Sequence, residues 1–238
     1  MKFRVMQWNI KINCKIEKIV EFIQSNINDN CIVNLQEVSL NSFSKIKEIL
    51  TKNAVFSLDL RTPGIYEGRN RKIGVATLVS WGKIKNKGLL NNSVFPERSL
   101  VTEIEFGNIN ITNLTFHSLT GVDYKKAKSS NFASIASSLA THSIDLFTCD
   151  ANEPKVDSFD DNLIECFDNR DKGENAGLLF GKNRINDLVD SYKSYAKINN
   201  LELNNGYTHM TGKIPKRYDF IYGNKSWKIQ SSKSYYTE

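Results

Sequence analysis

The sequence has no run of apolar residues long enough to cross a membrane. A transmembrane helix needs about 20 predominantly apolar residues, and no stretch of this chain approaches that length. The first 13 residues also lack the apolar core and the small-residue cleavage site of a secretory signal. We therefore expect no membrane contact, no secretion and a cytoplasmic location.

Cysteine is scarce and is not arranged for metal binding. Cys14, Cys31, Cys149 and Cys166 form no C-x-x-C pair, and none stands near a histidine at zinc-ligand spacing. Cys31 and Cys149 lie in apolar runs, where a reduced thiol packs as a small hydrophobe. Only four prolines are present and no repeat or linker interrupts the chain, so we predict one domain over residues 1–238.

Positive charge is what the sequence has in excess. The 32 Lys and Arg residues against 26 Asp and Glu give a net charge of +6, and the pI is about 9.0. This balance favours polyanionic partners, nucleic acid above all; no protein partner is indicated. Two basic segments are candidates for contact with a phosphate backbone. They are 65–74, with Tyr66, Arg69 and Arg71, and 213–217, with Lys216 and Arg217.

The hydrophobic pattern alternates between strand and helix periods. Strands are predicted at 3–9, 31–37, 54–60, 73–80, 100–106, 109–116, 144–149, 217–222 and 226–231, and helices at 15–28, 41–50, 123–140, 159–167 and 183–198. Gly107-Asn108 marks a hairpin, and the lysines of 123–132 are expected to form a solvated face. Hairpins together with crossovers favour an α/β sandwich with mixed sheets over a purely parallel fold.

Compact polar residues stand where the apolar runs end. Asn9, Glu37, His117 and Asp150 each close a run, Asn152 follows Asp150 by two residues, and Asp219 lies inside the last run. Taken singly, each has an ordinary explanation as a turn former, a core histidine or a solvated carboxylate. Because strand carboxyl ends converge on a shared crevice in layered α/β folds, we expect these side chains to meet.

These residue types suit chemistry on a phosphate ester. A Mg²⁺ site typically takes a carboxylate such as Glu37 and few other protein ligands, because Mg²⁺ keeps most of its waters. Asp150 and Asn152 project to the same side of an extended chain, so one can activate a water while the other donates to a phosphoryl oxygen. His117 and Arg98 supply further donors or positive charge. The set predicts metal-assisted in-line attack of water on phosphorus.

Six short motifs in order carry a family resemblance. They are Q-W-N (7–9), L-Q-E (35–37), R-S-L (98–100), T-F-H (115–117), C-D-A-N (149–152) and R-Y-D-F-I (217–221). Together they resemble the endonuclease/exonuclease/phosphatase superfamily, whose fold is deoxyribonuclease-I-like. The resemblance implies a four-layer sandwich, with two mixed β-sheets face to face and helices outside.

The resemblance also implies roles for single residues. Members hydrolyse phosphodiesters or phosphomonoesters with Mg²⁺ or Mn²⁺. Glu37 resembles the principal metal ligand with Asn9 beside it, and Asp150 resembles the residue that activates the attacking water. Asn152 resembles the phosphate-positioning amide, and His117 and Arg98 resemble phosphate contacts. Asp219 resembles the carboxylate that supports a second, C-terminal histidine.

The C-terminal part departs from the family pattern. The family ends with Ser-Asp-His and one more strand, whereas no histidine follows Asp219 here. His142 and His209 do not stand where that motif belongs. We expect the last strand of the domain to be missing, and three alternatives stay open: a truncated chain, a protein that works without this histidine, or an impaired relative.

Three functions are compatible with the sequence. The first is a magnesium-dependent nuclease or phosphodiesterase acting on DNA or RNA. The second is a phosphatase or phosphodiesterase acting on a small or lipid phosphate. The third is a nucleic-acid-binding relative that has lost catalysis.

Overall fold

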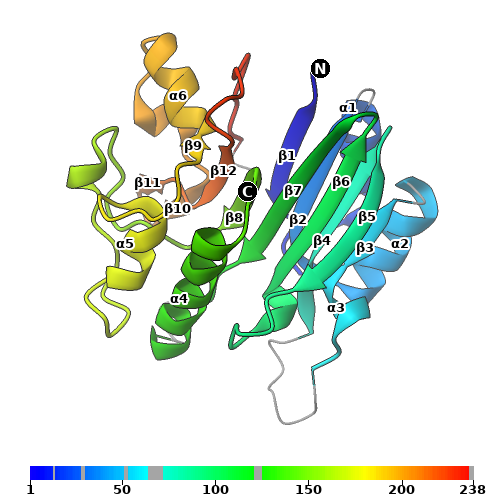
Figure 1. Ribbon diagram of the computed structural model, residues 1–238, viewed down its shortest axis with the longest axis horizontal. Coiled ribbons are helices and arrows are strands. Elements are labelled where there is room, and N and C mark those ends of the chain that lie inside the picture. The colour runs from blue at the N-terminus through cyan, green and yellow to red at the C-terminus, as the bar shows by residue number, and fades with distance from the viewer. Residues whose placement is uncertain (13, 28–29, 51–52, 64–71, 121–124, 236–238) are drawn as a thin grey trace. The chain divides into compact units, whose positions relative to one another are not determined.

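The computed structural model describes residues 1–12, 14–27, 30–50, 53–63, 72–120 and 125–235. Contacts divide the chain into two compact units, Met1–His117 and Ser118–Glu238, and each is described by itself. Figure 1 colours the first unit from blue to green and the second from green to red. The prediction of one domain over the whole chain stays a prediction.

The first unit alternates strands with short helices. Its elements are β1 (Arg4–Asn9), α1 (Ile16–Asn26), β2 (Cys31–Ser39), α2 (Leu40–Leu50), β3 (Ala54–Phe56), α3 (Ser57–Leu60), β4 (Ile73–Ser80), β5 (Lys83–Leu89), η3 (Pro96–Arg98), β6 (Ser99–Phe106) and β7 (Ile109–His117). Strands β1, β2, β4 and β3 form a mixed sheet in that order, in which β1 and β2 are parallel. Strands β5, β6 and β7 pair antiparallel.

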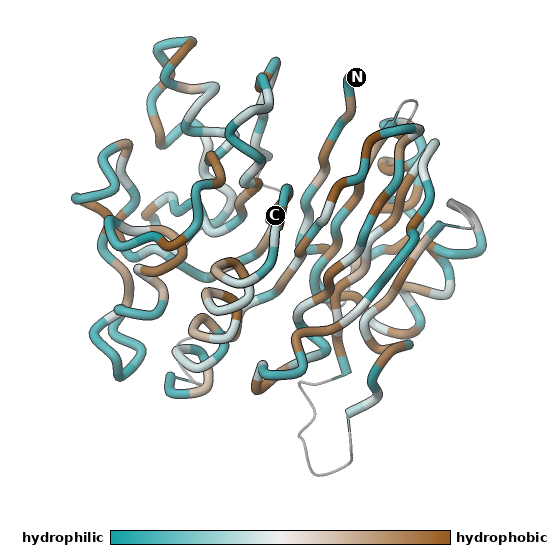
Figure 2. The backbone as a smooth tube through the Cα atoms, in the orientation of Figure 1, coloured by the Kyte–Doolittle hydropathy of each residue, from teal (hydrophilic) through white to brown (hydrophobic). Residues whose placement is uncertain are grey.

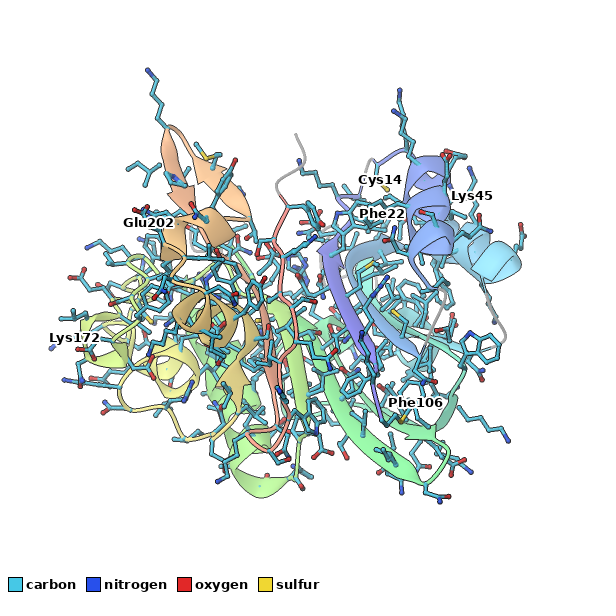
Figure 3. The ribbon with its side chains drawn as sticks, turned by 90° about the horizontal axis from the view of Figure 1, so that it is seen from above. Cys14, Phe22, Lys45, Phe106, Lys172 and Glu202 are labelled. Atoms are coloured by element: carbon cyan, nitrogen blue, oxygen red, sulfur yellow. The ribbon has the colours of Figure 1, made fainter. Side chains whose placement is uncertain are left out.

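The alternation of side chains along β2 explains how this unit packs. One core cluster contains Cys31, Val33 and Leu35 of β2 together with the apolar face of α1 and the face of α2 that carries Phe43. Successive residues of a strand point to opposite faces, so Asn34 and its even-numbered neighbours face the second sheet. Figure 3 labels Phe22 of α1 and Lys45 of α2 on the helical side.

A buried polar network joins the two sheets of the first unit. Asn34 donates from Nδ2 to Asn113 Oδ1 (2.9 Å) and accepts from Thr77 Oγ1 (2.7 Å). Gln36 Nε2 donates to Thr115 Oγ1 (3.1 Å). These side chains are fully buried, and buried polar groups cost free energy unless they are paired. The network therefore fixes the register of β2, which contains Glu37, against β7, which ends at His117.

The second unit is built on a small antiparallel sheet. Its elements are α4 (Lys125–Thr141), β8 (Leu146–Asp150), η4 (Asp161–Leu163), α5 (Glu174–Phe180), β9 (Val189–Asp190), α6 (Ser191–Ile198), η5 (Leu203–Gly206), β10 (His209–Thr211), β11 (Ile214–Lys216) and β12 (Asp219–Gly223). Strand β12 pairs with both β8 and β9. Strands β10 and β11 pair with each other in a separate hairpin.

Aromatic side chains form much of the core of this unit. Phe180 of α5 stacks on Phe220 of β12 with ring centroids 5.1 Å apart, and it meets Phe132 of α4 edge-on at 6.2 Å. Such pairs add about 0.5–1.5 kcal/mol to the burial of the rings. In Figure 2 the irregular connections of the unit are largely teal, whereas brown segments fall mainly in helices and strands.

The strongly periodic elements lie where the sequence predicts them. Strand β4 has the predicted bounds of 73–80, and α1 and α2 each differ by one or two residues. The predicted hairpin turn at Gly107 is present with a φ of +61°, a conformation that suits glycine. The longest predicted helix, 123–140, is present as α4 over its described part.

Four of the predicted elements are wrong in extent or type. The strand predicted at 54–60 stops at Phe56 because Ser57 Oγ accepts from Val75 N (2.9 Å) and α3 begins. The helix predicted at 159–167 is only the 3-10 turn η4. The helix predicted at 183–198 is α6 alone, since Asp190 caps its start. No strand is present at 226–231, and β5, α5 and the β10–β11 hairpin were not predicted.

The described residues also bear on membrane-spanning helices and on the state of the cysteines. Among them, no helix is both long and apolar enough to cross a membrane. All four cysteines are free thiols, and Cys31 and Cys149 are fully buried.

Candidate active site

In the first unit, a local irregularity of β2 orients Glu37. The pairing register between β2 and β4 shifts between Leu35 and Val38, and Glu37 has a φ of +56°. A bulge of this kind re-aims a side chain, and positive φ is costly for a residue with a β-carbon. The Glu37 side chain stays 25% exposed, so the carboxylate remains within reach of a ligand.

Asn9 and the loop after β1 hold the Glu37 carboxylate. Asn9 Nδ2 donates to Glu37 Oε1 (3.0 Å), and the backbone N–H of Ile12 donates to Oε2 (3.3 Å). Asn9 Oδ1 accepts from the backbone N–H of Lys11 (3.0 Å). Because β1 and β2 are parallel neighbours, their carboxyl ends bring these two side chains together.

His117 and Arg98 complete the cluster in this unit. Arg98 Nη1 lies 3.2 Å from His117 Nδ1, and His117 Nε2 lies 3.7 Å from Glu37 Oε1. Burial first, and then the Arg98 guanidinium, hold the pKa of His117 well below its ordinary value. A neutral imidazole that accepts from arginine at Nδ1 carries its proton on Nε2. The Nε2–H donor is therefore on the Glu37 side of the ring.

In the second unit, two carboxylates lie on neighbouring strands. Asp150 ends β8 and Asp219 begins β12, and the two are partners in the antiparallel register. Side chains of such partners share one face about 5 Å apart, where two like charges repel unless donors or a cation offset them. Thr208 Oγ1 accepts from the backbone N–H groups of Tyr218 (3.1 Å) and Asp219 (3.2 Å), which fixes where β12 begins.

Asn152 stands on a loop with a buried ionic support. Its backbone has a φ of +50°, and its N–H donates to Asp150 Oδ1 (3.1 Å). Its carbonyl accepts from Lys128 Nζ (2.8 Å), which also pairs with Glu153 Oε1 (2.9 Å). Lys128 and Glu153 are 1% and 0% exposed in their side chains. Glu153 accepts in addition from Phe167 N (2.9 Å).

The substrate-binding candidates fall into three groups. Tyr66, Arg69 and Arg71 lie outside the described residues. Lys216 is half-buried at the end of β11. Arg217 is buried, and its guanidinium pairs with Asp157 Oδ2 (2.7 Å) and Asp190 Oδ2 (2.8 Å).

These contacts give Arg217 a structural role. Burial lowers the pKa of Arg217, but the Asp190 and Asp157 carboxylates more than offset this and raise it above its ordinary value. Its guanidinium is engaged inside the protein, so we assign it no contact with substrate.

Sequence reasoning missed the groups that support the site. Lys128 was expected on a solvated face and is buried instead. The signal was present, because Lys128 lies four residues before Phe132 and so falls on the same core stripe of α4 as Phe132 and Ile135. Thr208 gave no such signal, since its contact with the start of β12 depends on a hairpin that was not predicted.

The donor set of the first unit fits one kind of metal ion. Glu37 and Asn9 offer oxygen atoms at an accessible position, and Mg²⁺ takes few protein ligands and keeps its waters. The described residues contain no group of three or more His, Cys, Asp or Glu side chains that could enclose a metal. Carboxylate and amide oxygens of this kind suit a hydrated, hard cation such as Mg²⁺ or Mn²⁺.

No protein-family model matches the chain, and no curated protein sequence does. Solved structures do match. D. rerio TDP2 complexed with single-strand DNA product superposes with a TM-score of 0.63 at 12% identity, covering 94% of this chain and 85% of that one. An AP endonuclease from Archaeoglobus fulgidus superposes with a TM-score of 0.60 at 18% identity, covering 93% and 86%.

A third match carries the family description itself. An endonuclease/exonuclease/phosphatase family protein from Bacteroides thetaiotaomicron superposes with a TM-score of 0.58 at 15% identity, covering 93% of this chain and 82% of that one. These likenesses show the fold, and they confirm the predicted class: a mixed α/β protein with two mixed sheets and helices, deoxyribonuclease-I-like. The fold is one that this chain shares with phosphodiesterases and nucleases.

Proposed function

We propose that the chain is a divalent-metal-dependent phosphodiesterase that hydrolyses nucleic acid. The observation that carries the proposal is the cluster of Asn9, Glu37, His117 and Arg98, which the sequence pattern named and which the first unit brings within hydrogen-bonding or ion-pair distance. The shared fold of nucleases and phosphodiesterases supports it, as does the net charge of +6.

Glu37 and Asn9 would hold the cation. Glu37 presents two carboxylate oxygens that backbone and amide donors already orient. When bound, a divalent cation supplies Lewis-acid polarisation of a phosphoryl oxygen and neutralises developing charge. The bulge that positions Glu37 is part of this role, because the carboxylate must point outward from an otherwise buried strand.

His117 and Arg98 of the first unit would bind the phosphate. His117 holds a proton at Nε2 and can donate it in a hydrogen bond to a phosphoryl oxygen. Arg98 keeps the imidazole in this tautomer and adds fixed positive charge. Both side chains are buried, and preorganised donors in such surroundings stabilise developing negative charge more strongly than in water.

The polar groups of the second unit would handle the water. Asp150 would accept a proton from the attacking water at a carboxylate oxygen, and Asn152 would donate from Nδ2 to a phosphoryl oxygen. Asp219, the strand partner of Asp150, would keep negative charge beside it and so favour proton acceptance. The leaving oxygen departs opposite the water and takes its proton from solvent.

A hydrolysis assay with a matched control tests the proposal. Purified chain is incubated with labelled single- and double-stranded DNA and RNA in Mg²⁺, in Mn²⁺ and in EDTA. We expect metal-dependent cleavage that Glu37→Gln removes and that Glu17→Gln retains, because Glu17 is an exposed partner of Lys45. Cleavage of small phosphate esters alone would favour a phosphatase or phosphodiesterase acting on a small or lipid phosphate. Binding of nucleic acid without any hydrolysis would favour a relative that has lost catalysis.

A further inference from the structure

The second unit has a hollow that none of the roles above uses. Its volume is about 200 Å³, and its lining includes Lys155, Val156, Tyr207, Ile214 and Lys216. We call it the Tyr207 hollow. Two of its walls come from the loop after Asn152 and from strand β11, and a third includes the residues around η5.

Apolar side chains that face solvent gather at this hollow. Val156 is 42% exposed, Tyr207 is 37% exposed and Ile214 is 59% exposed. Single exposed apolar residues need no explanation, but several around one concavity indicate a binding surface. An aromatic ring with aliphatic neighbours offers a flat face on which a planar ring system can stack.

Two lysines give the hollow a cationic rim. Lys155 pairs with Glu165 at 3.4 Å while both side chains are more than half exposed, and such a surface pair contributes little. Its ammonium can therefore turn to a stronger anion. Lys216 Nζ donates to the carbonyl of Lys155, which leaves two of its three N–H donors for another acceptor. The acidic lining residue Asp157 is neutralised by Arg217 and Lys193.

Two walls of this hollow lie close in sequence to Asn152 and Asp219, to which the proposed function gives roles. Pro154, at the start of one wall, follows Asn152 by two residues, and Lys216, at the end of another, precedes Asp219 by three. An aromatic face between lysines is how proteins bind single strands, with a base on the ring and phosphates on the cations. A small phosphate ester has no second nucleotide to fill such a place.

We propose that the Tyr207 hollow binds a nucleotide that flanks the scissile phosphate of a single-stranded nucleic acid. This inference rests on the proposed function and deepens it, because it selects a nucleic-acid strand over a small or lipid phosphate as substrate. The base would stack on Tyr207 beside Val156 and Ile214, and Lys155 and Lys216 would contact the adjoining phosphates.

Binding measured without cleavage tests the inference separately from catalysis. Fluorescence anisotropy of a labelled single-stranded oligonucleotide is followed in EDTA for the wild type, Tyr207→Ala and Ile214→Asp. We expect the dissociation constant of Tyr207→Ala to rise roughly fivefold to 150-fold, the range for loss of one stacked base. Ile214→Asp should weaken binding as well, since it adds a negative charge at an exposed position. Tyr235→Ala, at a tyrosine that is 68% exposed elsewhere, should bind as the wild type does.

The lysines give a second, independent readout. For a single strand, each phosphate contact contributes about −0.7 to the slope of log K against log salt. Lys155→Ala and Lys216→Ala should each make the slope shallower by about that amount, whereas Lys182→Ala, at an exposed lysine outside the hollow, should not. Thermal melting of each variant shows whether it is folded.

The outcomes separate this inference from the proposed function. Weaker binding by the hollow variants, with no hydrolysis by the wild type in Mg²⁺, would uphold the hollow and reject the enzyme. Unchanged binding by folded Tyr207→Ala and Ile214→Asp would reject the hollow even if the wild type cleaves nucleic acid. Binding of anionic vesicles that depends on Tyr207, with none to the oligonucleotide, would also overturn it.

Discussion

Glu37 and Asn152 both have positive φ, and each is a residue to which the proposed function gives a task. For Asn152 the conformation is mild, since asparagine visits the left-handed region more readily than most residues. For Glu37 it is costly and persists because the bulge, Asn9 and the N–H of Ile12 together fix the side chain. Backbone strain of this kind gathers at functional sites.

The strand-end positions of several candidate site residues could be predicted from sequence because these residues close strongly apolar runs. Asn9, His117 and Asp150 are the last residues of β1, β7 and β8, as the pattern indicates. The conformation of Glu37 could not be predicted in this way. Glu37 lies inside β2, and a bulge depends on the register with β4, which a single strand's own pattern does not contain.

Cys166 gives a prediction about pH at the residue scale. Burial, and then the Glu153 carboxylate, raise the pKa of its thiol from the ordinary value of 9.0 to about 12. At pH 8 the native thiol should therefore react with iodoacetamide roughly a thousandfold more slowly than an unperturbed thiol, because only the thiolate reacts. Mass spectrometry of labelled peptides, native and in urea, measures the ratio.

The same shift has a consequence for stability. The unfolded chain releases the Cys166 proton near pH 9, before the native chain does, so this contribution is full below pH 9 and is lost as pH rises towards 12.

Rapid native labelling at pH 8 would show that the thiol is not in the environment described. Cys166→Ser, which lacks the thiol, identifies the labelled peptide.

At the scale of elements, helix α4 has a charged residue, Lys128, at a buried position where its helical pattern predicts an apolar one. Lys128 Nζ is enclosed by the Glu153 carboxylate, the Asn152 carbonyl and the rings of Phe132 and Phe167, whose centroids lie 5.6 and 5.7 Å away. Pattern reasoning assigns lysine to the surface by default. Lys128 is an exception because its buried partner, Glu153, comes from a loop distant in sequence, which the pattern of the helix does not contain.

This buried pair should be sensitive to the loss of one partner. Lys128→Met leaves the Glu153 charge buried without its counter-ion, so we expect the free energy of unfolding to fall by about 3–5 kcal/mol. Urea denaturation measures the loss. Lys126→Met, on the exposed side of the same helix, is the control and should change little.

The double variant Lys128→Met/Glu153→Gln removes both charges and should recover most of that stability. A loss below about 1 kcal/mol in the single variant would mean that the ion pair is not buried as described. Equal losses in the single and double variants would mean that the two charges do not act as a pair.

For the whole molecule, the order of motifs along the chain predicted the fold better than any local pattern did. Each motif is short, but six in register from Gln7 to Ile221 indicate one superfamily, and the fold found by superposition agrees. Short or irregular elements such as η4, α5 and the β10–β11 hairpin escaped prediction, because contacts distant in sequence stabilise them more than their own periodicity does.

The net charge leads to a prediction for the molecule as a whole. With +6 over 238 residues, binding of an oligonucleotide should weaken steadily with salt as Lys and Arg contacts release counterions. Between 50 and 200 mM salt we expect a loss of about tenfold or more, measured by anisotropy in EDTA. An affinity that does not change with salt would argue for a small phosphate as substrate.

The most direct test of the central claim is a comparison of kcat/KM for Glu37→Gln, Asp150→Asn and the double variant on an oligonucleotide in Mg²⁺. Groups that act in one chemical step are strongly non-additive. We predict that each single variant loses about a thousandfold or more and that the double variant loses no more than the worse single one. Full activity in either folded single variant, or losses that multiply in the double variant, would contradict the claim that Glu37 and Asp150 serve one hydrolytic reaction.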